Sequence, residues 1–143
     1  MRILGLDIGD RRIGMAISDD LGLTAQGLAT LERRSERADV AALQEVIATH
    51  QVQRIVVGLP RHMDGSYGVQ AEKTERFAHV LEQACRLPCI RWDERLTTQQ
   101  AERLLIAAHQ RRQRRRAVRD KLAAQLILQN YLDYVRATSP LSS

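Results

Sequence analysis

The chain has 143 residues, 44% hydrophobic and 27% charged, and no apolar run is long enough to span a membrane. Its 22 basic and 17 acidic residues give a formal net charge of +5 and a pI of 9.9, which favours a polyanionic partner. We expect one domain over residues 1–138 and a flexible tail at 139–143. The first residues lack the basic and apolar regions of a secretory signal, so we expect a cytoplasmic location.

The first predicted element is a tight β-hairpin. Apolar runs at 3–8 and 13–17 flank the turn sequence Gly-Asp-Arg-Arg. Asp7 interrupts the first run near its end. Because an unpaired buried carboxylate is very costly, Asp7 needs a metal ion, a basic side chain or water as a partner. Of these partners we favour a divalent metal.

The later elements follow from hydrophobic periodicity and turn residues. We expect a strand at 23–31, a charged connection at 32–36, a helix at 37–49, a strand at 54–58, a helix at 69–83, a strand at 89–92, a helix that begins at Thr97 or Thr98, and a final helix at 118–135. The buried side of the helix at 69–83 is predicted to hold Val69, Phe77, Val80, Leu81 and Ala84. Cys85 and Cys89 have no further ligands at metal-binding spacing, so we expect reduced cysteines.

This order of elements predicts an α/β fold. Short turns make the first three strands antiparallel, whereas strand–helix–strand crossovers make the last two strands parallel to the first. The expected product is a mixed five-stranded sheet with helices on both faces.

Arginines form one dense block in the last third of the chain, at positions 111, 112, 114, 115, 116 and 119. Such a block repels itself, so we expect a segment that is flexible or ordered by a partner. Nucleic acid is the partner that this block favours, although a solvated basic surface is the alternative.

Three acids are predicted to lie at the ends of elements: Asp7, Glu94 and Asp120. If they converge, a set of carboxylates without cysteine or histidine favours Mg²⁺ or Mn²⁺. Two such ions about 4 Å apart support phosphodiester cleavage. The alternatives are that Glu94 pairs with a neighbouring arginine and that Asp120 only stabilises a helix start.

Four segments together resemble the YqgF family, also called RuvX, of the RNase H-like superfamily. They are the hairpin at 5–16, the segment Val-Val-Gly-Leu-Pro at 56–60 with Asp64-Gly65, the segment Asp-Glu-Arg-Leu-Thr at 93–97, and the stretch at 120–132. The resemblance implies an RNase H-like fold and a metal-dependent nuclease that processes the 5′ end of pre-16S ribosomal RNA. The alternatives are a Holliday junction resolvase and a non-cleaving RNA-binding protein on the same fold. Actin-like ATPases and sugar kinases open on a similar hairpin, but they need two such domains.

The resemblance also implies roles for single residues. Asp7 becomes the metal-bridging acid, Glu94 the second acid and Asp120 the third, with Asp93 as a competitor of Glu94. Arginines are expected to bind substrate phosphates through their guanidinium groups: Arg11, Arg12, Arg95, Arg111, Arg112, Arg114, Arg115 and Arg116. The expected partner is structured RNA or branched DNA, bound by a monomer or a weak homodimer.

Overall fold

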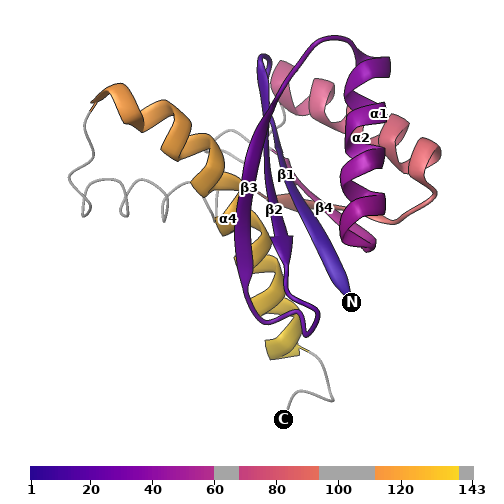
Figure 1. Cartoon of the computed structure of the whole chain (residues 1–143), viewed down its shortest axis with the longest axis vertical. Helices are drawn as coiled ribbons and strands as arrows, with labels where there is room; N and C mark the ends of the chain where they lie inside the picture. The colour runs from indigo at the N-terminus through magenta and orange to yellow at the C-terminus, as the bar shows by residue number, and fades with distance from the viewer. Residues whose placement is uncertain (60–67, 94–111, 139–143) are drawn as a thin grey trace.

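A mixed five-stranded sheet forms the centre of the molecule (Figure 1). The computed structural model describes residues 1–59, 68–93 and 112–138, the last range with side chains from 122 to 137. The strand order is β3-β2-β1-β4-β5, with β1–β4 and β4–β5 parallel and the other pairs antiparallel, as predicted. The strands are β1 (Arg2–Ile8), β2 (Arg12–Ser18), β3 (Ala25–Glu32), β4 (Val52–Leu59) and β5 (Cys89–Asp93).

Helices cover both faces of this sheet, which confirms the predicted α/β arrangement. Helices α1 (Glu36–His50) and α2 (Val69–Cys85) lie on one face, and α4 (Arg112–Thr138) lies on the other (Figure 1). Because side chains alternate along a strand, β1 contributes to both cores. Leu4, Leu6 and Ile8 join the core under α1 and α2, whereas Ile3 joins the core under α4. None of the described helices is long and apolar enough to cross a membrane.

Helix α4 packs directly on β1 at Gly5. A Cβ added at Gly5 would lie 2.8 Å from the Cβ of Leu128 and 3.3 Å from the carbonyl oxygen of Ala124. Ala124 is itself fully buried. The small residues at these two positions therefore set the distance between the helix and the sheet.

We expect the Gly5→Ala substitution to lower the free energy of unfolding by about 1–3 kcal/mol, because the added methyl group overpacks this contact. Urea denaturation measures the change. Gly5→Ala with wild-type stability would contradict the close packing.

The start of β3 and the buried face of α2 differ from the prediction. Strand β3 begins at Ala25 rather than at residue 23, because the Asp19 carboxylate accepts the backbone N–H groups of Leu23 and Thr24 at 2.7 and 3.2 Å. Val69 is 69% exposed, so its predicted burial was wrong. Ala84 is exposed as well. The buried face of α2 instead holds Ala71, Thr74, Phe77, Ala78 and Leu81, at helical spacing.

The start of the last helix also differs from the prediction. Helix α4 begins at Arg112, six residues before the predicted start, so it includes arginines 112, 114, 115, 116 and 119. Arginine has a high intrinsic helix propensity, and this preference outweighs the repulsion between like charges in a helix that is anchored further along. The helix expected from Thr97 or Thr98 and the tail at 139–143 lie outside the described residues.

Candidate active site

Asp7 lies on the α4 face of the sheet, near the end of the central strand β1. Its position follows from alternation, since Ile3 and Gly5 pack against α4 and Asp7 is the next residue on that side. Asp7 is half-buried. The carboxylate therefore belongs to the sheet face where α4 approaches β1.

Glycine is the neighbour of Asp7 across the sheet. In the antiparallel ladder, Asp7 is paired with Gly14 of β2. The parallel register with β4 ends at the pair Leu6–Val57, and the next residue of β4 is Gly58. The residues of β2 and β4 at this level are thus glycines, which place no side chain beside Asp7.

A β-bulge follows on the next strand. The β2–β3 register shifts from the pair Ile13–Leu31 to the pair Met15–Leu28, so that Ala29 and Thr30 lie opposite Gly14. Bulges are frequent beside active sites because they bend a strand and redirect its side chains. This bulge bends β3 at the level of Asp7.

The β1–β2 turn carries the two arginines that were predicted to bind phosphate. The backbone N–H of Gly9 donates to the Arg12 carbonyl at 2.9 Å, and a Cβ at Gly9 would lie 2.8 Å from the same oxygen. Arg11 is exposed and Arg12 is half-buried. Glycine at position 9 therefore allows the tight turn. Arg11 and Arg12 belong to this turn and follow Asp7 closely in the sequence.

Strand β5 is fixed to α2 by Arg91. Its guanidinium forms ion pairs with Glu75 at 3.1 Å and Glu82 at 3.3 Å. The Glu82 carboxylate also accepts the backbone N–H of Cys89 at 3.2 Å, and this hydrogen bond is the main cause that lowers the pKa of Glu82. These contacts show that Arg91 and Cys89 face α2.

The alternation along β5 separates Asp93 from Asp7. Cys89, Arg91 and Asp93 share the α2 face, whereas Ile90 and Trp92 pack against the α4 core. Asp93 therefore lies on the sheet face opposite Asp7. Glu94 follows it and lies outside the described residues.

The other predicted site residues are placed only in part. Asp120 and arginines 112, 114, 115 and 116 belong to α4, where the structure describes their backbone alone. Arg95 and Arg111 lie outside the described residues. Within the described part of the chain, no group of three or more His, Cys, Asp or Glu side chains is arranged to hold a metal ion. The set of Asp7, Glu94 and Asp120 stays a prediction.

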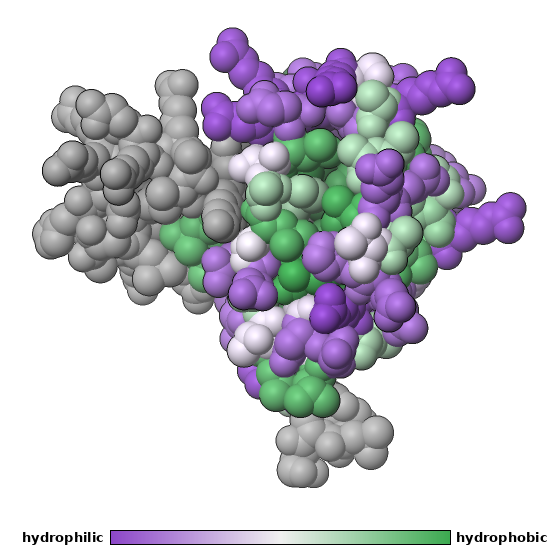
Figure 2. Space-filling view, in the orientation of Figure 1, coloured by the Kyte–Doolittle hydropathy of each residue, from purple (hydrophilic) through white to green (hydrophobic). Residues whose placement is uncertain are grey.

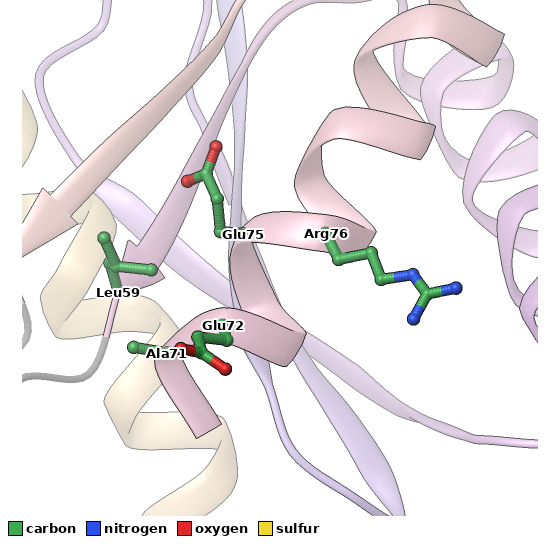
Figure 3. Close-up of a pocket in the computed structure, with 5 residues that line it drawn as sticks. All are labelled: Leu59, Ala71, Glu72, Glu75 and Arg76. Atoms are coloured by element: carbon green, nitrogen blue, oxygen red, sulfur yellow. The ribbon is translucent and has the colours of Figure 1, made fainter. Parts of the chain in front are cut away.

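A cavity of about 590 Å³ lies beside the start of α2, away from Asp7. Its described lining is Leu59, Ala71, Glu72, Glu75 and Arg76. Figure 3 shows Leu59 and Glu75 on the side toward β4, whereas the Arg76 side chain points away from both. The described lining residues of the cavity therefore do not include Asp7.

The two cysteines are free, as expected, and lie where α2 ends and β5 begins. Burial raises the pKa of the Cys89 thiol to about 12, and burial also raises the pKa of Cys85. Both thiols are therefore protonated at neutral pH, which fits a packing role rather than a nucleophilic one.

A comparison with models of known protein families agrees with the observed fold and hairpin. The model of the RuvX family, described as Holliday junction resolvase, matches residues 1–134. This chain belongs to the RuvX family. The match includes the β1–β2 hairpin, β5 and nearly all of α4, and therefore every residue predicted for the site of this RuvX-family chain.

Two relatives are about half identical to this RuvX-family chain. A protein of Syntrophus aciditrophicus named "Putative pre-16S rRNA nuclease" is 52% identical over 135 residues, which cover 94% of this chain and 90% of the relative. A protein of Heliobacterium modesticaldum with the same name is 52% identical over 133 residues, covering 93% and 89%.

Solved structures of resolvases share the fold. RuvC from T. thermophilus, in complex with a Holliday junction substrate, aligns with a TM-score of 0.62 at 14% identity, covering 96% of this chain and 97% of RuvC. The Fowlpox virus resolvase, in complex with Holliday junction DNA, aligns with a TM-score of 0.51 at 13% identity, covering 97% and 99%. The expected RNase H-like fold is confirmed.

Proposed function

We propose that this RuvX-family chain is a nuclease that hydrolyses phosphodiester bonds and processes the 5′ end of pre-16S ribosomal RNA in the cytoplasm. One observation carries the proposal: a half-buried carboxylate, Asp7, lies one residue before the end of the central strand, with a glycine paired opposite it. Relatives that are 52% identical and named as pre-16S rRNA nucleases support the RNA substrate.

The register of α4 on β1 supports Asp120 as a second ligand. Leu128 meets β1 at Gly5, and Tyr131 accepts a hydrogen bond from Arg54, whose strand position pairs with Ile3. Helix and strand therefore run in opposite directions. From Gly5 to Asp7 the strand rises by about 6.6 Å, and from Ala124 back to position 120 the helix rises by about 6 Å. Because these two lengths are nearly equal, they favour a position for residue 120 of the helix at the level of Asp7 on the strand.

The alternation of β5 favours Glu94 over Asp93 as the remaining acid. Asp93 shares its face with Arg91, which pairs with α2. The next residue belongs to the α4 face if the strand pattern continues by one position. We therefore propose Glu94, rather than Asp93, as the acid that joins Asp7.

The donor set fits a hard divalent cation, which we propose is Mg²⁺ or Mn²⁺. Asp7, Glu94 and Asp120 offer only carboxylate oxygens, the ligands that these ions prefer. When bound, the ions supply an activated water and stabilise the leaving oxygen of a phosphodiester.

The chain's own arginines bind and orient the nucleic acid in this proposal. Arg11 and Arg12 contact phosphates near Asp7, since their turn directly follows β1. Arg95 and the arginines at 111, 112, 114, 115 and 116 bind flanking phosphates and add affinity that decreases with salt.

Holliday junction cleavage is the second candidate, because this chain shares its fold with RuvC over 96% of its length. A resolvase that cuts two strands symmetrically acts as a dimer, whereas processing of one RNA end requires only a monomer. The substrate therefore distinguishes the two activities.

A cleavage assay with the wild-type protein and Mn²⁺ tests the proposal. We expect a precursor RNA with an extended 5′ end to be cut near the mature end, and a four-way DNA junction to stay intact. Preferential cutting of the junction would support the resolvase instead. Binding of the RNA without cutting of either substrate would contradict the nuclease.

A further inference from the structure

Arg33 contacts the β1–β2 turn through both its backbone and its side chain. Its backbone N–H donates to the Arg11 carbonyl at 2.9 Å, and its Nη1 donates to the Gly9 carbonyl at 2.9 Å. Arg33 lies directly after β3, so these bonds connect two segments that are 24 residues apart. Two carbonyls of the four-residue turn are thereby held by one residue.

The guanidinium of Arg33 is anchored on its other side by the α1 and α2 layer. Its Nε pairs with Asp39 Oδ2 at 3.1 Å, and Asp39 is only 2% exposed. The other oxygen of Asp39 accepts the Arg34 backbone N–H at 3.0 Å. The guanidinium carbon lies 5.0 Å from the centre of the Phe77 ring. Arg33 thus connects the turn to the buried Asp39 and to Phe77.

At its end, strand β1 is paired with β2 but no longer with β4, so contacts from outside the sheet matter more there. The ladder with β4 ends at Leu6–Val57, whereas the ladder with β2 continues through Asp7 and Ile8. Gln70 adds one side-chain bond to the Ile8 carbonyl, at 3.3 Å. Figure 2 has the same orientation as Figure 1. Hydrophilic residues cover the end of the molecule that holds the turn and the start of α1.

We propose that Arg33 is a positioning residue for the nuclease reaction. It fixes the β1–β2 turn, and through the turn it fixes the Asp7 carboxylate and Arg11, without contacting the substrate. The inference rests on the proposed function, because Asp7 must hold a metal ion for its position to affect the rate. A displacement of about 1 Å at a reacting group can cost about a hundredfold in rate.

A direct contact between Arg33 and a phosphate is the competing role. Arg33 lines a cavity of about 290 Å³ together with Glu36, Lys73, Arg76 and Phe77. However, its Nε and Nη1 atoms already bond to Asp39 and Gly9, and its side chain is only 23% exposed. These bonds favour the positioning role, and the kinetic constants distinguish the two roles.

The test compares Arg33→Gln, the milder Arg33→Lys and the control Arg54→Gln in RNA cleavage with Mn²⁺, together with thermal unfolding. Arg54 is also half-buried and donates one side-chain bond at 2.9 Å, to Tyr131, but it lies at the start of β4. We expect kcat to decrease by about 10- to 100-fold in Arg33→Gln and less in Arg33→Lys, with KM for RNA within about twofold of wild type. Arg54→Gln is expected to lower only the unfolding temperature.

Two results would overturn the positioning role: a wild-type kcat in both Arg33 variants, or a higher KM with unchanged kcat, which indicates a phosphate contact. Failure of the proposed function looks different, because then the wild type does not cleave, or Asp7→Asn cleaves as well as the wild type. In that case the role of Arg33 is refuted together with the nuclease.

Discussion

The Asp7→Asn substitution is expected to reduce RNA cleavage by at least about a thousandfold. Asparagine has the shape of aspartate but no negative charge, so it is a poor ligand for a divalent cation. Stabilisation of transition-state charge by metal ions is worth several kcal/mol, and each 1.36 kcal/mol corresponds to a factor of ten in rate. The loss should appear in kcat at saturating RNA and Mn²⁺.

Asp20→Asn is the matched control for this experiment. Asp20 lies outside the candidate site, after the end of β2, where its carboxylate is 81% exposed and pairs with Arg2 at 2.9 Å. This substitution removes the same charge from the chain, so we expect wild-type cleavage. Circular dichroism is used to check that both variants are folded. Metal-dependent cleavage that survives in Asp7→Asn would refute the role of Asp7.

The second large effect is expected at Glu94, the residue that follows Asp93 in the sequence. Glu94→Gln should reduce cleavage by about a hundredfold or more, whereas Asp93→Asn should stay within about threefold of wild type. The reason is the alternation of β5, which assigns Asp93 to the α2 face with Arg91 and Cys89. Glutamine and asparagine keep the size of each side chain, so the comparison isolates the charge.

Single-turnover cleavage of the precursor RNA measures both variants under the same conditions. The reverse pattern, with a large loss in Asp93→Asn and none in Glu94→Gln, would exchange the two assignments and leave Asp7 unaffected. Equal and small losses in both variants would show that neither acid holds the metal.

The directions of the strands in the sheet could be predicted because they depend on the connections between consecutive strands, which are visible in the sequence. Tight turns at 9–12 and 19–24 and the crossovers through α1 and α2 determine which strands run antiparallel or parallel. The errors arose where particular side chains and packing decide. The Asp19 carboxylate delays the start of β3, and the packing face of α2 excludes Val69, although valine is hydrophobic. Helix α4 begins six residues earlier than predicted, within the arginine block.

The candidate site was predictable to different degrees. Asp7 is visible in the sequence because a carboxylate interrupts an apolar run, which has a physical cost. Asp93 and Glu94 are adjacent, and only the register of β5 with β4 and α2 shows which face Asp93 shares. Arg33 gave no signal within the charged connection at 32–36, because its importance comes from contacts with Gly9 and Asp39.

Binding of Mn²⁺ in the absence of RNA tests the central claim, that Asp7 holds a divalent metal on the α4 face. Electron paramagnetic resonance of free Mn²⁺ gives the dissociation constant for the wild type, Asp7→Asn and Asp20→Asn. We expect the wild type and Asp20→Asn to bind alike, and Asp7→Asn to bind at least about tenfold more weakly, a loss of about 1.4 kcal/mol. Equal Mn²⁺ affinity in all three proteins would contradict the metal site at Asp7.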